Sequence, residues 1–385
     1  MHKIVFIIIY FGELPWYFDI FCHSCIQNNS IEFIFFGDHI SSSIKAKNIN
    51  KIYFSTTDFN NLASKKLNLK INIEHGYKLC DFRPAFGKIF EDYTEGFDFW
   101  GVCDIDIIIG NIRGFLTSDI LNNYDYISVK PEYPTGFFSV FKNTGLIKYL
   151  FNKSKHISTI YTNEKNYMFD ECGGCYDEVI AGKNILDIKT KTDSLHHLLE
   201  KNLHNIRSLF EFYSIEGLPG YIKYINGVLS FKNKYEILIY HLSDYKKNYF
   251  TQKRVVISQN GFYINKFSIT RIGLIHKLLG ILFDKCIIFK YRALTLIDIC
   301  AMFLIRRKFI LDNQKFNYMN QKFEIYSDKG RMHYKFSYYS NQIFKSTLLK
   351  KHFYLTGLRK YFKYADGGIC IIQKNGTPIF YNISN

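Results

Sequence analysis

The sequence predicts an α/β fold for residues 1–250, with helices packed around a mostly parallel central sheet. Short apolar runs typical of buried strands alternate here with segments of helical periodicity, an order that favours parallel β-α-β units. Several runs end at glycine or acidic residues, as at Gly37-Asp38, which indicates turns at strand ends. From about residue 250 the composition becomes basic, and residues 251–385 are predicted to form a separate α+β region.

The elements follow in order along the chain. The first strand is expected at 3–11, in an apolar run, and the first helix at 15–27, where Pro15 suits the opening turn. Spaced leucines predict a second helix over 59–69, and Pro84 opens a third over 84–93. The other predicted strands are short and rich in apolar residues: 31–36, 51–54, 97–103, 106–109, 124–129, 136–141 and 236–242. Ligands of such sheets bind beyond the carboxyl ends of the strands, so the residues that follow them are expected to share one crevice.

The positive charge of the chain is concentrated in its C-terminal third. The net charge is +16, and residues 251–385 hold 23 Lys and Arg against 6 Asp and Glu, which gives +17 for this region alone. Such a region favours an acidic partner, for example an anionic membrane surface, a phosphorylated acceptor or nucleic acid. Residues 271–311 mix helical periodicity with basic residues, as an interfacial helix would, although packing on the first domain could produce the same pattern. The tail from residue 320 has the apolar patterning of strands.

Targeting signals and cysteines predict a cytoplasmic protein, and the basic C-terminal region could hold it at the inner face of the cell membrane. Lys3 precedes an apolar run, but Glu13 follows and no cleavage site is visible. No transmembrane helix is predicted, because charged residues interrupt the apolar region 272–305. Nine cysteines, an odd number, are expected to be reduced thiols. Two pairs have CxxC spacing, Cys22/Cys25 and Cys172/Cys175, but their separation favours core packing and a glycine-rich turn over a shared zinc site.

The strongest chemical signal is the pair Asp104 and Asp106 in FDFWGVCDIDIIIGNIRGF, between two apolar runs. In an extended segment, residues i and i+2 point to the same side, so both carboxylates are expected to face one spot. Like charges at that spacing repel each other unless a cation lies between them. Mg2+ or Mn2+ suits oxygen ligands and commonly shares its remaining positions with substrate phosphates. The pattern therefore predicts an enzyme that holds a diphosphate through a metal, while a solvated turn between two strands is the alternative.

With these residues in view, the N-terminal region resembles the GT-A-fold glycosyltransferases. More closely, it is similar to a bacterial family associated with capsular polysaccharide and lipopolysaccharide synthesis. The likeness covers roughly residues 1–250, and its most specific element is the Trp-Gly-x-Cys-Asp-x-Asp run from Trp100 to Asp106. The other similar segments are IIIYFGELPWYF, YKLCDFRPAFGKIF and GFFSVFKN. The resemblance implies a sandwich of the nucleotide-diphospho-sugar transferase type.

The resemblance also implies roles for the metal site. Asp106 would be the main ligand of Mn2+ or Mg2+, and Asp104 would share the metal or hold the ribose of the donor. His241 is the candidate third ligand, although a satisfied histidine at a strand end is an equal reading. Lys246 would touch the donor phosphates.

Further donor-binding residues are expected at other strand ends and in the segment 77–90. Tyr10, Phe11 and Gly12 would line the base pocket, with Asp38 in the same crevice, unless the two aromatic residues simply close the core. In the segment 77–90 the candidates are Asp81, Arg83 and Lys88. An ion pair between Asp81 and Arg83 that fixes the turn before Pro84 is the alternative.

Asp170 and Glu171 are the catalytic candidates. An inverting transferase needs a carboxylate that removes the proton of the acceptor hydroxyl, whereas a retaining one needs a group that orients the acceptor. A solvated loop acid or a helix cap would also explain these two residues.

The sequence therefore predicts a glycosyltransferase, with residues 1–250 as the catalytic domain and residues 251–385 as an acceptor-binding or membrane-binding region. Its partners would be a nucleotide-sugar, with a UDP-sugar as the first choice, and a glycan or lipid-linked acceptor, without nucleic acid. A sugar nucleotidyltransferase is the enzymatic alternative, although no glycine-rich phosphate loop is present. A basic protein that binds nucleic acid or an anionic surface is the non-enzymatic alternative.

Overall fold

The computed structural model describes residues 1–39, 46–248, 250–253, 261–273 and 275–289, together with three strands between residues 362 and 382. The chain divides into two compact units, of which the first comprises Met1–Lys246 and Lys253–Lys277. The second comprises Lys247–Gln252 and Leu278–Asn385. The first unit therefore extends past residue 250, and the assignment of separate functions to residues 1–250 and 251–385 stays a prediction.

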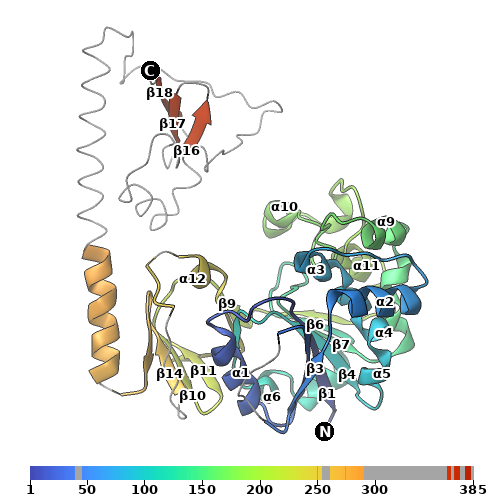
Figure 1. Cartoon of the computed structure of the whole chain (residues 1–385), viewed down its shortest axis with the longest axis horizontal. Coiled ribbons are helices and arrows are strands. Elements are labelled where there is room, and N and C mark those ends of the chain that lie inside the picture. Colours follow the sequence, from blue (N-terminus) through green and yellow to red (C-terminus); the bar gives the residue numbers. More distant parts are fainter. Residues whose placement is uncertain are drawn as a thin grey trace. The chain divides into compact units, whose positions relative to one another are not determined.

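The first unit is a mixed α/β structure with a mostly parallel seven-stranded sheet, which confirms the predicted fold class (Figure 1). The strand order is β3-β2-β1-β4-β7-β6-β8. β7 runs antiparallel to both neighbours, and the other pairs are parallel. The strands are β1 (Ile4–Ile9), β2 (Glu32–Gly37), β3 (Ile49–Tyr53), β4 (Phe99–Cys103), β6 (Tyr126–Ser128), β7 (Phe138–Lys142) and β8 (Ser208–Phe210).

Side chains alternate along β1 between two cores, one on each face of the sheet. Phe6 and Ile8 enter the first core with residues of α1, whereas Val5 and Ile7 enter the second. Figure 1 shows α1 and α6 on the first face and α2, α4, α9 and α11 on the second. The α-helices are α1 (Phe18–Gln27), α2 (Thr56–Leu67), α3 (Leu79–Phe82), α4 (Phe86–Ile89), α5 (Glu91–Thr94), α6 (Ile112–Phe115), α7 (Ser118–Asn123), α8 (Gly145–Lys148), α9 (Ile157–Thr162), α10 (Tyr176–Ile180), α11 (Leu195–Glu200) and α12 (Ser243–Lys247). The short 3-10 helices are η1 (Gly76–Lys78), η2 (Arg83–Ala85), η3 (Leu150–Lys153) and η4 (Ile185–Asp187).

Two smaller sheets complete the first unit. One has the order β5-β13-β9 and comprises β5 (Ile107–Ile109), β13 (Ile239–His241) and β9 (Ser214–Ile215). The other is antiparallel and comprises β10 (Ile222–Ile225), β11 (Val228–Phe231), β12 (Tyr235–Ile237), β14 (Gly261–Ile264) and β15 (Ile269–Arg271).

Two sequence predictions about single elements are wrong. The helix expected at 84–93 is divided into η2, α4 and α5. The division between α4 and α5 falls at buried Phe90, whose ψ of 31° lies outside the helical range. The strand expected at 236–242 is divided at Leu238, where the chain passes from β12 in the antiparallel sheet to β13 in the three-stranded one. The backbone N–H of Leu238 donates to Tyr213 and its carbonyl accepts from Gly110, so the backbone groups at this step are satisfied.

The second unit contains a small antiparallel sheet of β16 (Phe362–Ala365), β17 (Gly368–Ile372) and β18 (Pro378–Asn382), which agrees with the strands predicted in the tail. Within the predicted helical region 271–311, residues 275–289 form a helix, and most of the remainder lies outside the described residues. None of the helices in the described part of the chain is both long and apolar enough to cross a membrane.

Candidate active site

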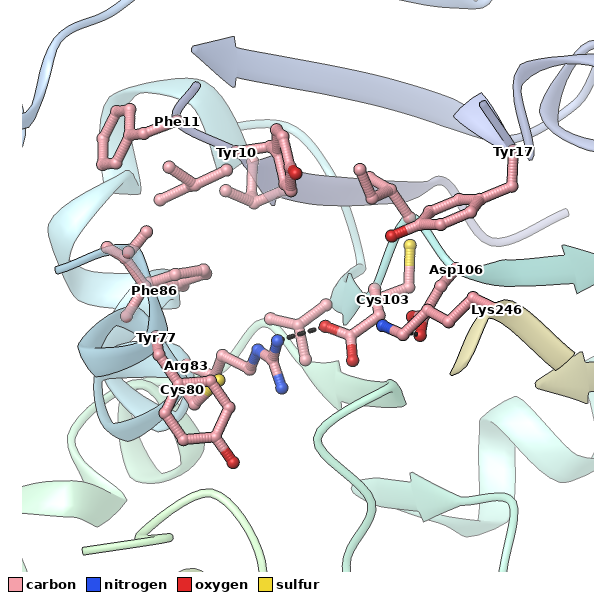
Figure 2. Close-up of a pocket in the computed structure, with 17 residues that line it drawn as sticks. Tyr10, Phe11, Tyr17, Tyr77, Cys80, Arg83, Phe86, Cys103, Asp106 and Lys246 are labelled. Atoms are coloured by element: carbon pink, nitrogen blue, oxygen red, sulfur yellow. Dashed lines mark hydrogen bonds and ion pairs between the residues drawn. The ribbon is translucent and has the colours of Figure 1, made fainter. Parts of the chain in front are cut away.

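A pocket of about 350 Å³ lies where β1 and β4 end, within the size range of small-molecule sites (Figure 2). Tyr10 and Phe11 follow β1, and the acidic pair follows β4, so the pocket lies at the carboxyl edge of parallel strands. Six of the residues predicted from the sequence line it: Tyr10, Phe11, Arg83, Asp104, Asp106 and Lys246.

Asp104 and Asp106 lie at the step where the chain leaves the central sheet. β4 ends at Cys103, and β5 begins at Ile107 in the three-stranded sheet. β13 pairs antiparallel with β5 and places His241 opposite Ile107. One ligand atom from each of Asp104, Asp106 and His241 lies within 4.8 Å of the others, so the predicted metal ligands do come together.

Asp106 is the most enclosed of the three ligands and is surrounded by cations. Its Oδ2 lies 2.6 Å from Lys246 Nζ and 3.4 Å from His241 Nε2. Burial raises the pKa of Asp106, but the hydrogen bonds and charges of His241 and Lys246 outweigh it and hold the pKa below its ordinary value. Burial lowers the pKa of His241, whereas its hydrogen bonds to Asp106 and Glu216 prevail and raise that pKa to about 9.

Arg83 joins Asp104 to a second carboxylate. Its Nη2 donates to Asp104, and its Nη1 donates to Asp170 Oδ2 at 2.8 Å. Asp170 is almost completely buried, and burial, aided by neighbouring carboxylates, raises its pKa in spite of Arg83. The alternative in which Arg83 pairs with Asp81 is wrong, because the two terminal nitrogens of the guanidinium donate to Asp104 and Asp170 instead.

Glu171 lies beside Asp170 but is held by different groups. It accepts from the backbone N–H of Gly136 at 3.1 Å and from the hydroxyl of Tyr176. Neither Asp170 nor Glu171 contributes to the pocket wall itself. Asp170 is connected to the pocket by the hydrogen bond from Arg83, and Glu171 is connected to the loop that contains Gly136 by the hydrogen bond from its backbone N–H.

Some predicted donor-binding residues have other partners. Asp81 is fully buried, where it pairs with Lys78 at 2.6 Å and accepts from the backbone N–H groups of Tyr167 and Phe169, so it holds a loop in place. Lys88 pairs with Glu91 at 2.8 Å and does not line the pocket.

Gly12 and Asp38 connect the ends of β1 and β2. The backbone N–H of Gly12 donates to Asp38 Oδ1 at 2.7 Å, and Gly12 has a φ of +92°, a value that glycine adopts without strain. The ends of β1 and β2 meet at this hydrogen bond, but neither residue lines the pocket, so the predicted single crevice stays a prediction for this pair. A role in donor binding stays a prediction for both.

Sequence reasoning missed several residues of the site. Tyr17, Tyr77, Cys80 and Cys103 line the pocket, and Figure 2 shows the Tyr17 ring beside Asp106 and Lys246. The predicted helix 15–27 includes Tyr17, but nothing in its spacing marks it as a site residue. Tyr77 and Cys80 belong to the segment 77–90, in which only the charged residues carry a signal for donor binding.

Glu216 is the other missed residue, and only tertiary structure reveals it. It lies 2.7 Å from His241 Nδ1 and 2.5 Å from Lys130 Nζ. Burial raises the pKa of Glu216, but hydrogen bonds from His241 and Lys130 outweigh it and lower the pKa to about 2. Glu216 is therefore ionised and accepts a hydrogen bond from each neighbour.

The donor set fits a divalent metal ion. In the described part of the chain, Asp104 uses only Oδ1 and Asp106 only Oδ2 in side-chain contacts, so each keeps an oxygen for an ion. Two carboxylates and one imidazole form a mixed oxygen and nitrogen set that could hold a divalent metal ion. Among the described residues, the cysteine pairs form no comparable group of three or more ligands.

Comparison with known proteins places the chain in a family without assigning its function. Residues 6–272 match the family described as "Family of unknown function (DUF6625)". The chain belongs to this family. The match includes all the site residues named above, from Tyr10 to Lys246. A comparison with curated proteins found no match.

Solved structures with some likeness to the chain include two transferases. The galactosyltransferase LgtC, solved with donor and acceptor sugar analogues, is 14% identical, with a TM-score of 0.30, over 55% of this chain and 75% of that one. Mouse xyloside xylosyltransferase 1, in its apo form, is 7% identical, with a TM-score of 0.28, over 38% of this chain and 71% of that one. Scores at this level do not establish a shared fold, so function has to be inferred from the site itself.

Proposed function

We propose that the protein is a metal-dependent glycosyltransferase of the GT-A-like type that uses a nucleotide-sugar donor. The observation that carries the proposal is the group of Asp104, Asp106 and His241 at the edge of the pocket, with ligand atoms within 4.8 Å of one another. Ligands that are separated by 135 residues in sequence meet there only because β13 pairs with β5. A solvated turn would not need such an arrangement.

The three ligands would hold Mn2+, with Mg2+ as the alternative ion. When bound, the metal would act as a Lewis acid that stabilises negative charge on the departing nucleoside diphosphate. Lys246 and Arg83 bring fixed positive charge to the same wall of the pocket, where they would bind and orient the phosphate oxygens.

The pocket also offers surfaces for the other parts of a donor. The aromatic side chains of Tyr10, Phe11 and Tyr17 line it and would pack against the nucleobase of the donor, for which a UDP-sugar is our first choice (Figure 2). Arg83, which is held by Asp170, lines the pocket and would hydrogen-bond sugar hydroxyls.

The acceptor would be a glycan or a lipid-linked oligosaccharide of a surface polysaccharide. Asp170 and Glu171 are the candidates to orient or deprotonate its hydroxyl. Burial raises the pKa of Asp170, and the neighbouring acids add to the effect, as expected of a carboxylate that takes up a proton. Arg83 contacts Asp170 and lines the pocket, so the guanidinium would have to move before the Asp170 carboxylate could reach the substrate.

The helix at residues 275–289 supports attachment to an anionic membrane surface. Its exposed apolar side chains fall on one face at helical spacing: Ile275, Leu278, Leu279, Leu282 and Phe289. Lys277 and Lys285 belong to the same helix, and the C-terminal third is strongly basic. Vesicle flotation should show binding that needs anionic lipid and falls in Leu278→Asp/Leu282→Asp. Leu203→Asp, which changes an exposed leucine elsewhere, is the control. Binding unaffected by the helix substitutions would contradict this part of the proposal.

The central test is turnover of UDP-, GDP- and CMP-sugars by the purified protein, with Mn2+ or with EDTA. Metal-dependent release of the nucleotide from one donor, lost in Asp104→Asn/Asp106→Asn, is the expected result. Asp187→Asn is the matched control, because this aspartate is exposed and does not line the pocket.

Other outcomes would separate the alternatives. Folded protein that binds no nucleotide-sugar, with or without metal, would contradict the proposal. Formation of pyrophosphate from a nucleoside triphosphate and a sugar phosphate would favour a nucleotidyltransferase. Salt-sensitive DNA binding that survives Asp106→Asn would favour the nucleic-acid-binding alternative.

A further inference from the structure

Glu216 occupies a place in the site that the proposed chemistry does not yet use. β9 pairs in parallel with β13, with Ile215 beside Tyr240, so the next residues along the two strands, Glu216 and His241, are also neighbours. Glu216 Oε1 lies 2.7 Å from His241 Nδ1. The other ring nitrogen, Nε2, lies 3.4 Å from Asp106 Oδ2. The imidazole is therefore placed between two carboxylates, one at each nitrogen.

Both oxygens of Glu216 are engaged, so its carboxylate has a fixed orientation. Oε1 contacts His241, and Oε2 lies 2.5 Å from Lys130 Nζ. Lys130 in turn donates to the hydroxyl of Tyr133 at 2.9 Å. The turn after Glu216 is also anchored, because the hydroxyl of Tyr240 donates to the carbonyl of Gly217 at 2.9 Å.

The His241 ring is restrained from its face as well as its edge. The Phe137 ring stacks on it, with 4.3 Å between the ring centroids and 27° between the planes. The His241 side chain is only 12% exposed. Rotation of the ring would break the contact with Glu216 and the stack together, so Nε2 remains directed toward Asp106.

We infer that Glu216, held by Lys130, is a positioning residue that keeps the proton on His241 Nδ1 and presents Nε2 to the metal. The inference rests on the proposed function, because it assumes that His241 is a metal ligand. A histidine ligand commonly donates its second ring N–H to a carboxylate, which fixes both its tautomer and its orientation, and loss of that partner typically weakens metal affinity by about 10–100-fold. Nothing in the local sequence around Glu216 indicates this role.

The test is direct Mn2+ binding, measured by calorimetry or by electron paramagnetic resonance, in the absence of any sugar donor. Glu216→Ala should weaken Mn2+ binding by about 10-fold or more. Glu216→Gln should fall between Glu216→Ala and the wild type, because its amide oxygen can still accept from Nδ1. In a His241→Ala background, Glu216→Ala should cost nothing further, since Glu216 acts through the ring. Glu211→Ala removes an exposed acid from the same segment and is the matched control.

A second readout follows the ring itself. Nitrogen NMR of metal-free protein labelled at histidine, recorded at a pH at which the His241 ring is neutral, should show the proton on Nδ1 of His241 in the wild type and a mixture of tautomers in Glu216→Ala. A merely structural contribution of Glu216 would lower the melting temperature without changing the tautomer, and this result would overturn the inference.

Failure of the inference and failure of the proposed function have different signatures. If wild-type protein binds Mn2+ and His241→Ala weakens it, but Glu216→Ala does not, the inference is wrong and the metal site stands. If the folded wild type does not bind Mn2+ or Mg2+, the metal site is wrong, and the role of Glu216 falls with it.

Discussion

Gly136 provides a way to disturb the proposed donor site without removing any of its charged groups. A Cβ at this position would lie 2.2 Å from Asp170 Oδ2 and 2.4 Å from Arg83 Nη1. The backbone of Gly136 does not have a positive φ, so alanine would not strain the main chain. The substitution Gly136→Ala therefore acts on one contact, the ion pair between Arg83 and Asp170.

The size of the effect follows from these distances. Real Cβ atoms essentially never approach other atoms closer than 3.0 Å, so each charged group would have to move by at least several tenths of an ångström. The pair is buried and has an N–O distance of 2.8 Å. Disruption of a hydrogen bond between charged groups costs about 1.5–3 kcal/mol, and disruption of a buried pair as much as about 5 kcal/mol. This cost falls on the stability of the fold, whereas donor binding suffers through the displacement of Arg83 from the phosphates. A loss of about 1.4 kcal/mol in that interaction corresponds to a roughly 10-fold fall in donor affinity or turnover, which is the smallest effect that we expect.

The assay compares donor turnover, Mn2+ affinity and melting temperature for the wild type and Gly136→Ala. Mn2+ affinity should change less than donor turnover, because Gly136 reaches only one proposed ligand, Asp104, and does so only through Arg83. Gly145→Ala is the control, since a Cβ at Gly145 would meet no atom within 4 Å. Full donor turnover by a Gly136→Ala protein of unchanged stability would refute the reasoning and would exclude the ion pair from the donor site.

Three further predictions address Mn2+ binding, the pH dependence of stability and the ion pair that holds the loop at 163–171. Asp106→Asn should abolish measurable Mn2+ binding in calorimetry while Mn2+-free protein stays folded, and unchanged affinity would exclude Asp106 as a ligand. His196 is buried, and burial lowers its pKa from 6.5 to about 4, so the unfolded chain binds a proton that the folded chain does not. Stability is therefore expected to fall by about 3 kcal/mol from pH 7 to pH 4 through this group, and urea unfolding of His196→Phe should show a shallower pH dependence. Lys78→Met leaves the Asp81 carboxylate buried without its cation and should cost about 3–5 kcal/mol of unfolding free energy. Hydrogen exchange should then be faster in the loop at 163–171, and unchanged exchange would contradict the role of this pair.

The parts of the fold that sequence predicted well are those that depend on local pattern. Alternating apolar strands and helices near the N-terminus indicated β1, α1, β2 and β3 in the correct order, because strand and helix periodicities differ. α2 begins at Thr56, three residues before the predicted helix, since Ser55 and Asp58 form a capping box that the apolar pattern did not include.

The acidic pair was predictable for the same local reason. An i, i+2 spacing between two apolar runs requires no knowledge of the rest of the chain, and the structure does place both aspartates beside His241, a third residue that could hold a metal ion. His241 was a candidate only through the family resemblance. Its proximity depends on the pairing of β13 with β5, which no local pattern specifies.

The ion pairs around the site were harder to predict, because each basic side chain has several acids close enough to pair with it. Asp81 and Arg83 are close in sequence and of opposite charge, so a mutual pair was a reasonable alternative. In the structure, Arg83 instead reaches Asp170, which is 87 residues away, and Asp81 pairs with Lys78. Burial decides which pair forms, because a buried carboxylate without a cation strongly destabilises the fold. It therefore pairs with whichever cation the fold places beside it.

The same reasoning explains why the site combines two sheets. β4 carries the chain to Asp104 at the edge of the central sheet, and β5 begins after Asp106 in the three-stranded sheet, where β13 and β9 bring His241 and Glu216. A single sheet would align the carboxylates along one edge but would offer no strand to approach them from the other side. The step from Cys103 to Ile107 is therefore where a short motif becomes a three-ligand site, and the strand pairing beyond it determines whether the motif can bind a metal.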